Sequence, residues 1–302
     1  MTSQNKVALI TGGVSGMGLA VAKALAARGG WDLHLVDMNP SAGATAVESL
    51  PSAKFHQADV TDYGSLARCL RDIFAETRRL HFVFANAGIA EQTNFYERHE
   101  TADDGLEPPP PPNAALARVM FDGVVSTCYL ALHYFRLSPK DDDKSIVITS
   151  SCAGVYPSSY TPIYTGIKHG NLGLMRALAS AYWHFDRVRV NAICPGVVRT
   201  NLLNNNQWSQ FPPDSMTPLE TVERVVLMLA ENDREAGART EARIDGVVEN
   251  KEGVLWGEAV EVIGSDYYFR EPPKVSSPQM QVVMDATDIV LQGVENMAVY
   301  RG

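Results

Sequence analysis

Short apolar runs alternate with longer segments of helical periodicity along most of the chain. Seven runs are rich in β-branched and aromatic side chains, at residues 7–10, 33–37, 54–57, 82–85, 145–149, 189–193 and 259–263. Between them, Ala, Leu and Met recur at helical spacing at residues 19–28, 65–77, 114–135, 165–184 and 221–231. Strands that alternate with helices are typical of βαβ units. The pattern predicts one doubly wound α/β domain with a seven-stranded parallel sheet.

Two segments interrupt this alternation. The segment at about residues 91–112 ends in five consecutive prolines, Pro108 to Pro112, which favour an extended polyproline II conformation. We interpret it as a solvent-exposed insertion, with a docking site for a partner as the alternative. Residues 270–302 contain three more prolines and a segment that can form a helix at 279–299. We therefore predict one domain at residues 1–269 and a C-terminal extension at 270–302.

Composition and charge exclude several classes of protein. Of the 302 residues, 45% are hydrophobic and 20% are charged, which is ordinary for a globular protein and argues against disorder. The 35 acidic and 26 basic residues give a net charge of −9, and the Lys and Arg are scattered, which argues against nucleic acid as a partner. The four cysteines fit neither a disulfide scaffold nor a metal-ligand spacing.

The start of the chain and its hydropathy bear on the cellular compartment. Residues 1–5 are polar and lead directly into the first apolar run, unlike a signal peptide. No apolar stretch approaches the roughly 20 residues that span a bilayer. We expect a cytoplasmic protein without membrane insertion and without a bound metal.

A glycine-rich loop follows the first apolar run. Glycines let the chain turn tightly and approach a pyrophosphate, while the next helix begins with unpaired N–H groups. The next predicted strand ends in Asp37, where a carboxylate can bind the adenosine ribose hydroxyls and repel a 2′-phosphate. The alternative is that Asp37 caps a turn before Asn39. We predict an NAD site on a Rossmann fold, formed here by Gly12, Ser15, Gly16, Met17, Gly18, Asp37 and Met38.

Tyr164 and Lys168 are the candidate catalytic pair. Residues four apart lie on one face of a helix, so both side chains can point at the same spot. A tyrosine is a poor base at neutral pH unless a positive charge stabilises its phenolate, and both a lysine ammonium and an oxidised nicotinamide can do so. Tyr164 would exchange the proton of an alcohol, and Ser151 would orient the substrate oxygen.

Taken in order, these motifs resemble the short-chain dehydrogenase/reductase family, in its NAD-dependent type, over residues 6–264. The resemblance is carried by residues 11–18, Asp37, Asp59-Val60, Asn86-Ala87-Gly88, Ser151, Tyr164, Lys168 and Pro195-Gly196. Within the family, Lys168-His169-Gly170 and residues 191–196 are most similar to 15-hydroxyprostaglandin dehydrogenase and its relatives. The resemblance implies assembly as a homodimer or homotetramer. It also implies cofactor contacts by Asp59, Val60, Asn86, Ala87, Gly88, Tyr164, Lys168, Pro195, Gly196, Val198 and Thr200.

One position departs from the family pattern. Many members have an asparagine in the helix after the Asn-Ala-Gly triplet, where it fixes a water molecule in a proton relay to the lysine. Alignment on Gly123 places Met120 there, and a methionine side chain neither donates nor strongly accepts a hydrogen bond. The departure implies slower proton exchange, a rearranged relay, or adaptation to a different reaction.

The substrate side is expected to include a lid at about residues 201–220, whose aromatic and leucine side chains could cover a lipophilic substrate. Ordinary loop packing explains these residues equally well. The residues expected around the substrate are Tyr156, Tyr160, Thr161, Leu202 and Trp208. We predict NAD-dependent oxidation of a bulky lipophilic secondary alcohol to a ketone. The alternatives are an NAD(P)H-dependent ketoreductase of a biosynthetic pathway and a repurposed non-redox protein, either a cyclase or a scaffold.

Overall fold

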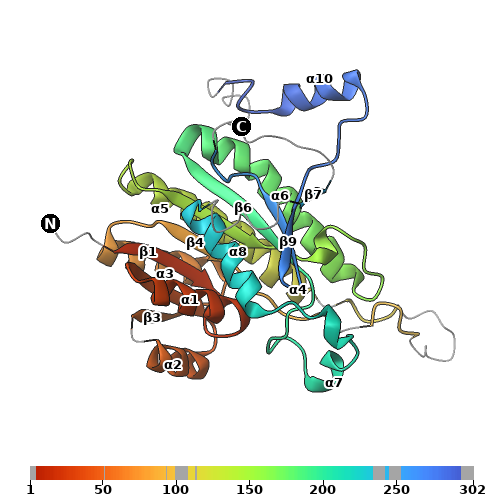
Figure 1. The fold of residues 1–302 in the computed structure, drawn as a ribbon, viewed down its shortest axis with the longest axis horizontal. Coiled ribbons are helices and arrows are strands. Elements are labelled where there is room, and N and C mark those ends of the chain that lie inside the picture. Colours follow the sequence, from red (N-terminus) through yellow and green to blue (C-terminus); the bar gives the residue numbers. More distant parts are fainter. Residues whose placement is uncertain are drawn as a thin grey trace.

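The computed structural model describes residues 5–50, 52–92, 94–98, 108–112, 114–233, 242–244 and 253–293. In this part of the chain, nine strands form one sheet in the order β3-β2-β1-β4-β5-β6-β8-β9-β7 (Figure 1). The strands are β1 (Lys6–Thr11), β2 (Trp31–Asp37), β3 (Ala53–Gln57), β4 (Phe82–Ala85), β5 (Lys144–Thr149), β6 (Val188–Pro195), β7 (Ala242–Ile244), β8 (Ala259–Ile263) and β9 (Asp266–Arg270). All seven predicted strands are present and pair in parallel. The doubly wound Rossmann fold is confirmed.

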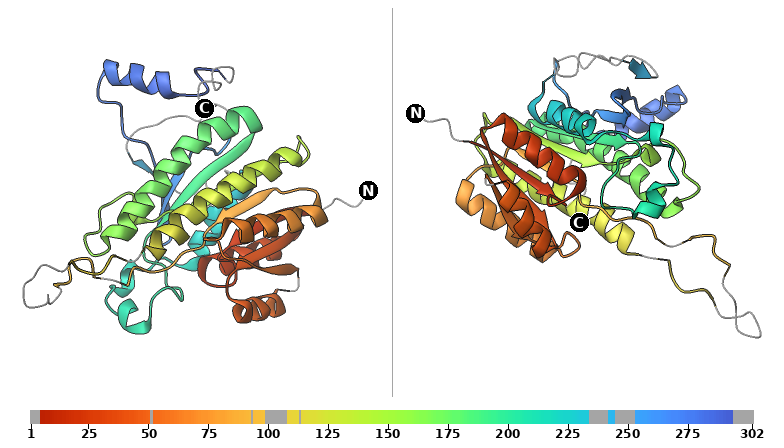
Figure 2. Two further views of the ribbon diagram at one scale, coloured as in Figure 1. Left: turned by 180° about the vertical axis from the view of Figure 1, so that it is seen from behind. Right: turned by 60° about the horizontal axis from the view of Figure 1, so that its bottom comes forward.

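Helices cover both faces of the sheet (Figures 1 and 2). Leucines and valines of α1 (Gly16–Arg28) and α8 (Leu219–Glu231) pack on one face. The other face is covered by α3 (Tyr63–Thr77), α5 (Gly123–Leu137) and α6 (Pro162–Asp186). Each corresponds to a predicted helix. The helix α2 (Pro40–Ser49) was not predicted, because its residues are mostly small and only Gly43 and Ala46 are buried.

A continuous helix, Ala115–Leu137, consists of α4 (Ala115–Ala117), the π-helical turn η1 (Arg118–Asp122) and α5. Among the described residues, it is the one helix that is long and apolar enough to cross a membrane, although the sequence had suggested no stretch of that length. Its buried residues, such as Ala131 and Phe135, belong to the core of the domain, and core helices of soluble proteins meet the same criteria. The lack of membrane insertion stays a prediction.

The sheet continues beyond the seven predicted strands. After a turn at Gly264, β9 returns antiparallel to β8, and β7 pairs in parallel with β9. The edge of β8 is thereby covered, which removes a row of unpaired backbone groups. Arg176 of α6 donates hydrogen bonds to the carbonyls of Arg270 and Glu271, at 3.5 and 3.2 Å. The prediction stopped two strands short because β9 and β7 are brief and follow the last βα unit.

The two segments that interrupted the sequence pattern pack little against the body. Residues 94–98 and 108–112 are exposed, contain no helix or strand, and project away from the domain (Figure 2). In the C-terminal extension, α10 (Pro278–Thr287) begins where a helix was expected but ends well before residue 299, and none of its residues is buried. The proposed domain boundary at residue 269 stays a prediction.

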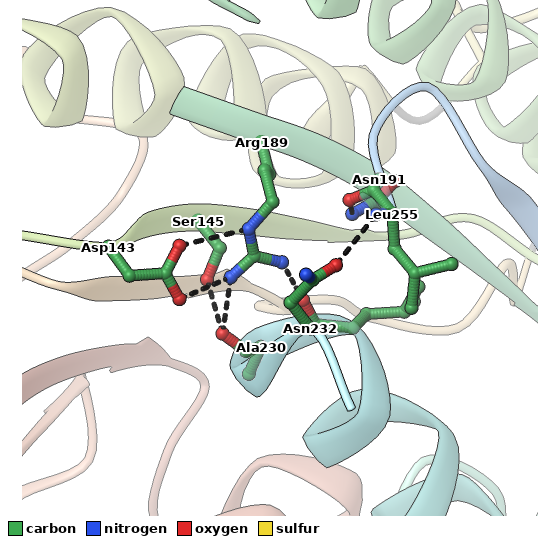
Figure 3. Close-up of polar contacts among 8 residues, drawn as sticks. Asp143, Ser145, Arg189, Asn191, Ala230, Asn232 and Leu255 are labelled. Atoms are coloured by element: carbon green, nitrogen blue, oxygen red, sulfur yellow. Dashed lines mark hydrogen bonds and ion pairs between the residues drawn. The ribbon is translucent and has the colours of Figure 1, made fainter. Parts of the chain in front are cut away.

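At the amino ends of β5 and β6, a buried arginine connects the sheet to α8 (Figure 3). Arg189 is 1% exposed, and its guanidinium pairs with both carboxylate oxygens of Asp143, at 3.1 and 2.7 Å. It also donates to the carbonyls of Leu229 and Ala230 in the last turn of α8, where the helix dipole favours a cation. Ser145 Oγ donates to the same Ala230 carbonyl at 3.1 Å.

The neighbouring asparagine of the 191–196 motif makes a separate set of hydrogen bonds next to this cluster (Figure 3). Asn191 Nδ2 donates to the Leu255 carbonyl at 2.9 Å, and its Oδ1 accepts from the Glu258 amide at 2.9 Å. The Leu255 amide in turn donates to Asn232 Oδ1 at 2.7 Å. These bonds hold the segment before β8 against β6, so Asn191 has a structural role.

Candidate active site

A cleft of about 400 Å³ opens at the carboxyl ends of β1, β2, β4 and β5, where ligands bind in doubly wound folds. The predicted cofactor residues that line it are Gly12, Ser15, Gly16, Met17, Asp37, Met38, Asp59, Val60, Asn86, Ala87, Gly88, Tyr164, Lys168 and Thr200. Gly18, Pro195, Gly196 and Val198 lie outside its lining. The fold thus gathers residues that are distant in the sequence into one elongated site.

The glycine loop lets the backbone form the floor of the cleft. Gly12 has a φ of +64°, which L side chains rarely adopt, and a Cβ there would lie 2.9 Å from the Ala87 Cα. At Gly18, a Cβ would lie 2.2 Å from the main-chain oxygen of Gly12. Gly18 therefore does not line the cleft itself. Its lack of a side chain lets α1 begin directly beneath the glycine loop. The resulting cradle at a helix N-terminus fits a pyrophosphate.

Asn86 connects three strands at the centre of the cleft. Its Nδ2 donates to the Thr11 carbonyl at 3.2 Å, and its Oδ1 accepts from Thr149 Oγ1 at 3.1 Å. The main-chain amides of Asn86 and Ala87 both donate to Thr11 Oγ1. The triplet that the resemblance assigned to the cofactor channel therefore also holds the glycine loop in place, and Thr11 and Thr149 are partners that the sequence did not reveal.

Two carboxylates line the cleft near the end of β2. Asp37 Oδ1 accepts a hydrogen bond from the Asn39 amide at 3.0 Å, so the turn-capping alternative describes a real contact. Asp59 Oδ1 similarly accepts from the Thr61 amide at 2.8 Å. Among the described residues that line the cleft, Lys168 is the one Lys or Arg, and no cation stands beside Asp37 to bind a 2′-phosphate.

Tyr164 and Lys168 line the cleft, whereas Ser151 lies outside its lining, next to Tyr164. Lys168 is buried, and its Nζ donates to the Thr149 carbonyl at 2.9 Å. The same Nζ lies 5.4 Å from the centroid of the Tyr164 ring. The Ser151 hydroxyl is close enough to the Tyr164 phenol to lower its pKa, accepts from the Ala153 amide at 3.1 Å and donates to Cys152 Sγ at 3.8 Å. The three side chains can therefore act on one bound group.

Burial shifts both members of the pair toward the neutral state. Desolvation raises the pKa of Tyr164, although the hydrogen bond with Ser151 acts in the opposite direction. Desolvation lowers the pKa of Lys168 to about 8. A positively charged ligand beside the phenol would favour its ionised form. The site is thus poised to become a base when such a ligand binds.

A glutamate that the sequence did not single out holds the start of the catalytic helix. Glu91 Oε2 accepts a hydrogen bond from the main-chain amide of Tyr164 at 2.8 Å, in the first turn of α6, where amides lack intrahelical partners. A carboxylate is also favoured at this end of the helix dipole. Glu91 lies in the segment interpreted as an insertion, where a single acidic residue gives no signal.

The comparisons with known proteins agree with this geometry. The family model for short chain dehydrogenases matches residues 6–210. The chain belongs to this family. A short-chain dehydrogenase/reductase of Penicillium rubens, prx7, is 42% identical over 273 residues, which cover 90% of this chain and 96% of the relative. The 15-hydroxyprostaglandin dehydrogenase (NAD(+)) of Homo sapiens is 31% identical over 212 residues, or 68% and 73% of the two chains.

A solved structure supports the fold of this short-chain dehydrogenase. The 3-ketoacyl-(acyl-carrier-protein) reductase from Brucella melitensis, complexed with NADH, has a TM-score of 0.68 at 19% identity. The match covers 87% of this chain and 99% of that chain. At this identity the likeness concerns the fold alone.

Met120, at the position where many short-chain dehydrogenases have asparagine, lines the cleft and is 1% exposed. Its sulfur would lie 3.6 Å from a Cβ at Gly88, so the side chain packs over the Asn-Ala-Gly triplet. Its carbonyl accepts a hydrogen bond from Asn171 Nδ2 at 3.0 Å. This hydrogen bond joins the main chain of residue 120 to α6 and does not depend on the side chain at that position.

The cysteines near the site are not activated. All four cysteines of the chain are free. Burial raises the pKa of the Cys194 thiol to about 12, and it also raises the pKa of Cys152. Both agree with the interpretation of these residues as small packing side chains.

Of the residues expected around the substrate, the structure brings Leu202 into the cleft lining. Tyr156 donates its hydroxyl to Glu261 Oε2 at 3.0 Å, and Tyr160 is 83% exposed. Trp208 is buried, and its Nε1 donates to the Thr200 carbonyl at 3.0 Å. Thr161 donates to Ser158 Oγ at 3.3 Å. The substrate roles of these five residues, and the lid, stay predictions.

Pro195, Gly196 and Val198 support the cleft from outside its lining. Pro195 ends β6, and a Cβ at Gly196 would lie 2.6 Å from Ile263 Cδ1. Val198 is a member of the buried core. Thr200, which does line the cleft, has its Cβ 3.3 Å from where a Gly16 Cβ would be. These residues bring the chain after β6 toward the glycine loop.

Proposed function

We propose that this short-chain dehydrogenase oxidises a bulky lipophilic secondary alcohol to a ketone with NAD. The observation that carries the proposal is that Tyr164 and Lys168 line the same cleft as Asp37 and the glycine loop, with Ser151 beside the Tyr164 phenol. The glycine loop, the acidic residue Asp37 at the end of β2 and the basic residue Lys168 thus lie along one cleft. An oxidised nicotinamide bound there would supply the hydride acceptor.

The residues of the chain have separate tasks in this reaction. Ser151 would donate a hydrogen bond to the substrate oxygen and orient it toward Tyr164. Tyr164 would take the hydroxyl proton as the carbon loses a hydride, and Lys168 would stabilise the phenolate by its positive charge. Glu91 would keep Tyr164 in place through its main-chain amide.

Asp37 supports NAD rather than NADP as the cofactor. Its second carboxylate oxygen is available to the ribose hydroxyls of an adenosine, whereas a 2′-phosphate would meet a negative charge. No Lys or Arg among the described lining residues at that end of the cleft offsets this repulsion. The NAD(+) in the name of the 31% identical relative supports the same choice.

The apolar walls support a lipophilic substrate. The cleft is lined by Ile89, Val119, Met120 and Leu202, and the first three belong to one apolar cluster with Tyr164. Apolar walls exclude water during hydride transfer. They favour a hydrocarbon skeleton around the reacting carbon over a highly charged substrate.

We also propose that the enzyme assembles as a homodimer or homotetramer through α5 and α6. Val125, Tyr129 and Leu137 of α5 and Phe185 of α6 are exposed apolar side chains on these two helices. Light scattering on the purified protein tests this, and Tyr129→Glu should yield the monomer if the face is an interface.

The proposed reaction is tested by cofactor binding and turnover. Calorimetry should show tight binding of NAD and weak binding of NADP. A panel of secondary alcohols should then produce NADH, followed by its near-ultraviolet absorbance. A ketone panel with NADH and with NADPH addresses the ketoreductase alternative. Absence of binding of either cofactor would favour the scaffold or cyclase alternative.

A further inference from the structure

Tyr156 joins the loop between Ser151 and Tyr164 to the far part of the sheet. Its hydroxyl donates a hydrogen bond to Glu261 Oε2 on β8, at 3.0 Å. Among the described side-chain hydrogen bonds of residues 152–161, this is the one that reaches another strand, whereas the others join neighbours in the sequence. Because Tyr156 is 44% exposed, burial alone does not hold its ring in this place.

The acceptor of this bond belongs to an ion pair on the hairpin of β8 and β9. Glu261 and Arg270 point to the α6 face of the sheet, since their strand neighbours Val262 and Phe269 belong to the opposite core. Arg270 Nη1 lies 3.4 Å from Glu261 Oε2, and the two side chains are 13% and 11% exposed. The Arg270 guanidinium also lies over the Tyr156 ring, with its Cζ 5.3 Å from the centroid, so a cation–π contact adds to the hydrogen bond.

The hairpin is in turn tied to the helix that carries Tyr164. Arg176 of α6 donates to the main-chain carbonyls of Arg270 and Glu271, at 3.5 and 3.2 Å. These contacts form one closed path from the loop through the hairpin to α6. The hairpin lies after residue 210, where the match to the family model ends.

Residues 151–155 form the turn that carries Ser151, called here the serine turn. The Ala153 amide donates to Ser151 Oγ at 3.1 Å, and the Tyr156 amide donates to the Cys152 carbonyl at 2.7 Å. The Ser151 hydroxyl itself donates to the Cys152 thiol, at 3.8 Å. A thiol is a weak acceptor, so this hydroxyl can turn to a substrate oxygen at little cost. A displacement of Tyr156 is passed on to Ser151 through these bonds.

We propose that Tyr156 is a positioning residue, which acts through Ser151 and not by contact with the substrate. Its bond to Glu261, supported by Arg270, fixes the end of the serine turn against the β8–β9 hairpin. Ser151 Oγ is thereby held where it can meet a substrate oxygen beside Tyr164. The hairpin, which follows the last βα unit, becomes part of the framework of the active site. The inference rests on the proposed dehydrogenase function.

The decisive experiment is a double-mutant cycle between Tyr156 and Ser151. Tyr156→Phe removes the hydroxyl and keeps the ring, and kcat should fall about tenfold, because small displacements of a reacting group are costly. The dissociation constant of NAD, measured by calorimetry, should not change. In the Ser151→Ala background the same change should lower the residual kcat by less than about twofold, because the group through which Tyr156 acts is gone. Tyr63→Phe, at an exposed tyrosine of α3, is the matched control and should retain wild-type kcat.

A conservative variant of the acceptor separates the hydrogen bond from the charge. Glu261→Gln keeps an oxygen that can accept from the Tyr156 hydroxyl, so kcat should stay within about twofold of the wild type. A loss as large as that in Tyr156→Phe would show that the charge of Glu261 matters and not its bond to Tyr156, which would overturn the proposal.

A further measurement does not depend on turnover. The Cys152 thiol lies in the serine turn and is half-buried, while the other three cysteines are buried. Its reaction with an aromatic disulfide reagent, assigned with Cys152→Ser, should be about five- to tenfold faster in Tyr156→Phe, because the turn opens more often. The rate in Tyr63→Phe and in Glu261→Gln should equal that of the wild type.

The remaining outcomes also decide for or against the proposal. Wild-type kcat and Cys152 reactivity in Tyr156→Phe would overturn it. So would an equal loss of kcat with and without the Ser151 hydroxyl, because Tyr156 would then act on the substrate or on the whole fold. If Tyr156→Phe does not fold, Arg270→Met takes its place in the same cycle. If the wild type turns over no alcohol or ketone, the proposed function fails. A faster reaction of Cys152 in Tyr156→Phe would still support the tie, and an unchanged rate would overturn it.

Discussion

The two polar clusters at opposite ends of β5 and β6 differ in how completely their groups are paired. At the amino ends, the Arg189 guanidinium makes four hydrogen bonds, to Asp143, Leu229 and Ala230. At the carboxyl ends, the Lys168 ammonium makes one described hydrogen bond, and the buried Glu91 Oε1 and Asn171 Oδ1 accept none from described residues. Complete pairing stabilises a fold, whereas unpaired buried groups reduce stability and are kept where a ligand or a proton has to be bound.

The largest expected effect is on catalysis at the carboxyl ends. Tyr164→Phe removes the proton acceptor and should lower kcat by a factor of about 10² to 10⁴, while thermal unfolding changes little. Turnover is followed by NADH absorbance. Tyr63→Phe, at an exposed tyrosine at the start of α3, serves as the control and should retain wild-type turnover. A comparable loss of turnover in Tyr63→Phe would show that the activity does not depend specifically on the site of Tyr164.

The amino-end cluster should show the opposite pattern. Arg189→Met leaves the carbonyls of Leu229 and Ala230 and the half-exposed Asp143 carboxylate without their partner. The free energy of unfolding should fall by about 2–4 kcal/mol, measured by urea denaturation. The affinity of the folded variant for NAD should be unchanged. A variant as stable as the wild type would show that this cluster does not stabilise the domain.

The pH dependence of stability should reveal the burial of Lys168. Because its pKa falls from 10.5 to about 8 on folding, the unfolded chain binds more protons between these pH values, and stability should rise with pH across that window by up to about 3 kcal/mol. The buried thiols of Cys69, Cys128 and Cys194, with pKa values of about 12, act in the opposite direction above pH 9.

The readout is therefore the difference in unfolding free energy between the wild type and Lys168→Met at each pH. This difference should change between about pH 8 and 10.5 and be constant below it. A difference that is the same at every pH would mean that Lys168 titrates alike in both states.

The smallest expected effect concerns the two ends of β2. Asp37→Asn removes the charge at the carboxyl end and should weaken NAD binding by about tenfold. The ratio of NADP affinity to NAD affinity should therefore increase. Asp32→Asn makes the same change at an exposed position near the amino end and should alter neither affinity. Calorimetry with both cofactors measures the ratio. An unchanged ratio in Asp37→Asn would leave turn capping as the role of Asp37.

The sequence predicted the central sheet and the helices that cover it, because apolar periodicity records which faces are buried. It also predicted Ser151, Tyr164 and Lys168. One follows a strand end and two lie on one helix face, and regular secondary structure fixes where such residues stand. Glu91 and Asn171 could not be predicted in the same way. The partner of a lone polar residue depends on how another element packs against it. The spacing of Asn171 from Lys168 indicates only that both lie on the same face of the helix. The directions of Tyr156 and Trp208 depend on loop conformation, which no periodicity encodes.

The strand β9 and its tie to α6 set a limit for shortening the chain in the laboratory. Removal of residues from 265 onward would leave β8 as a bare edge, and pairing between copies through that edge promotes aggregation during expression. The carbonyls that Arg176 binds belong to Arg270 and Glu271. A shortened protein for crystallisation should therefore end after Glu271 and can omit α10, which buries none of its residues.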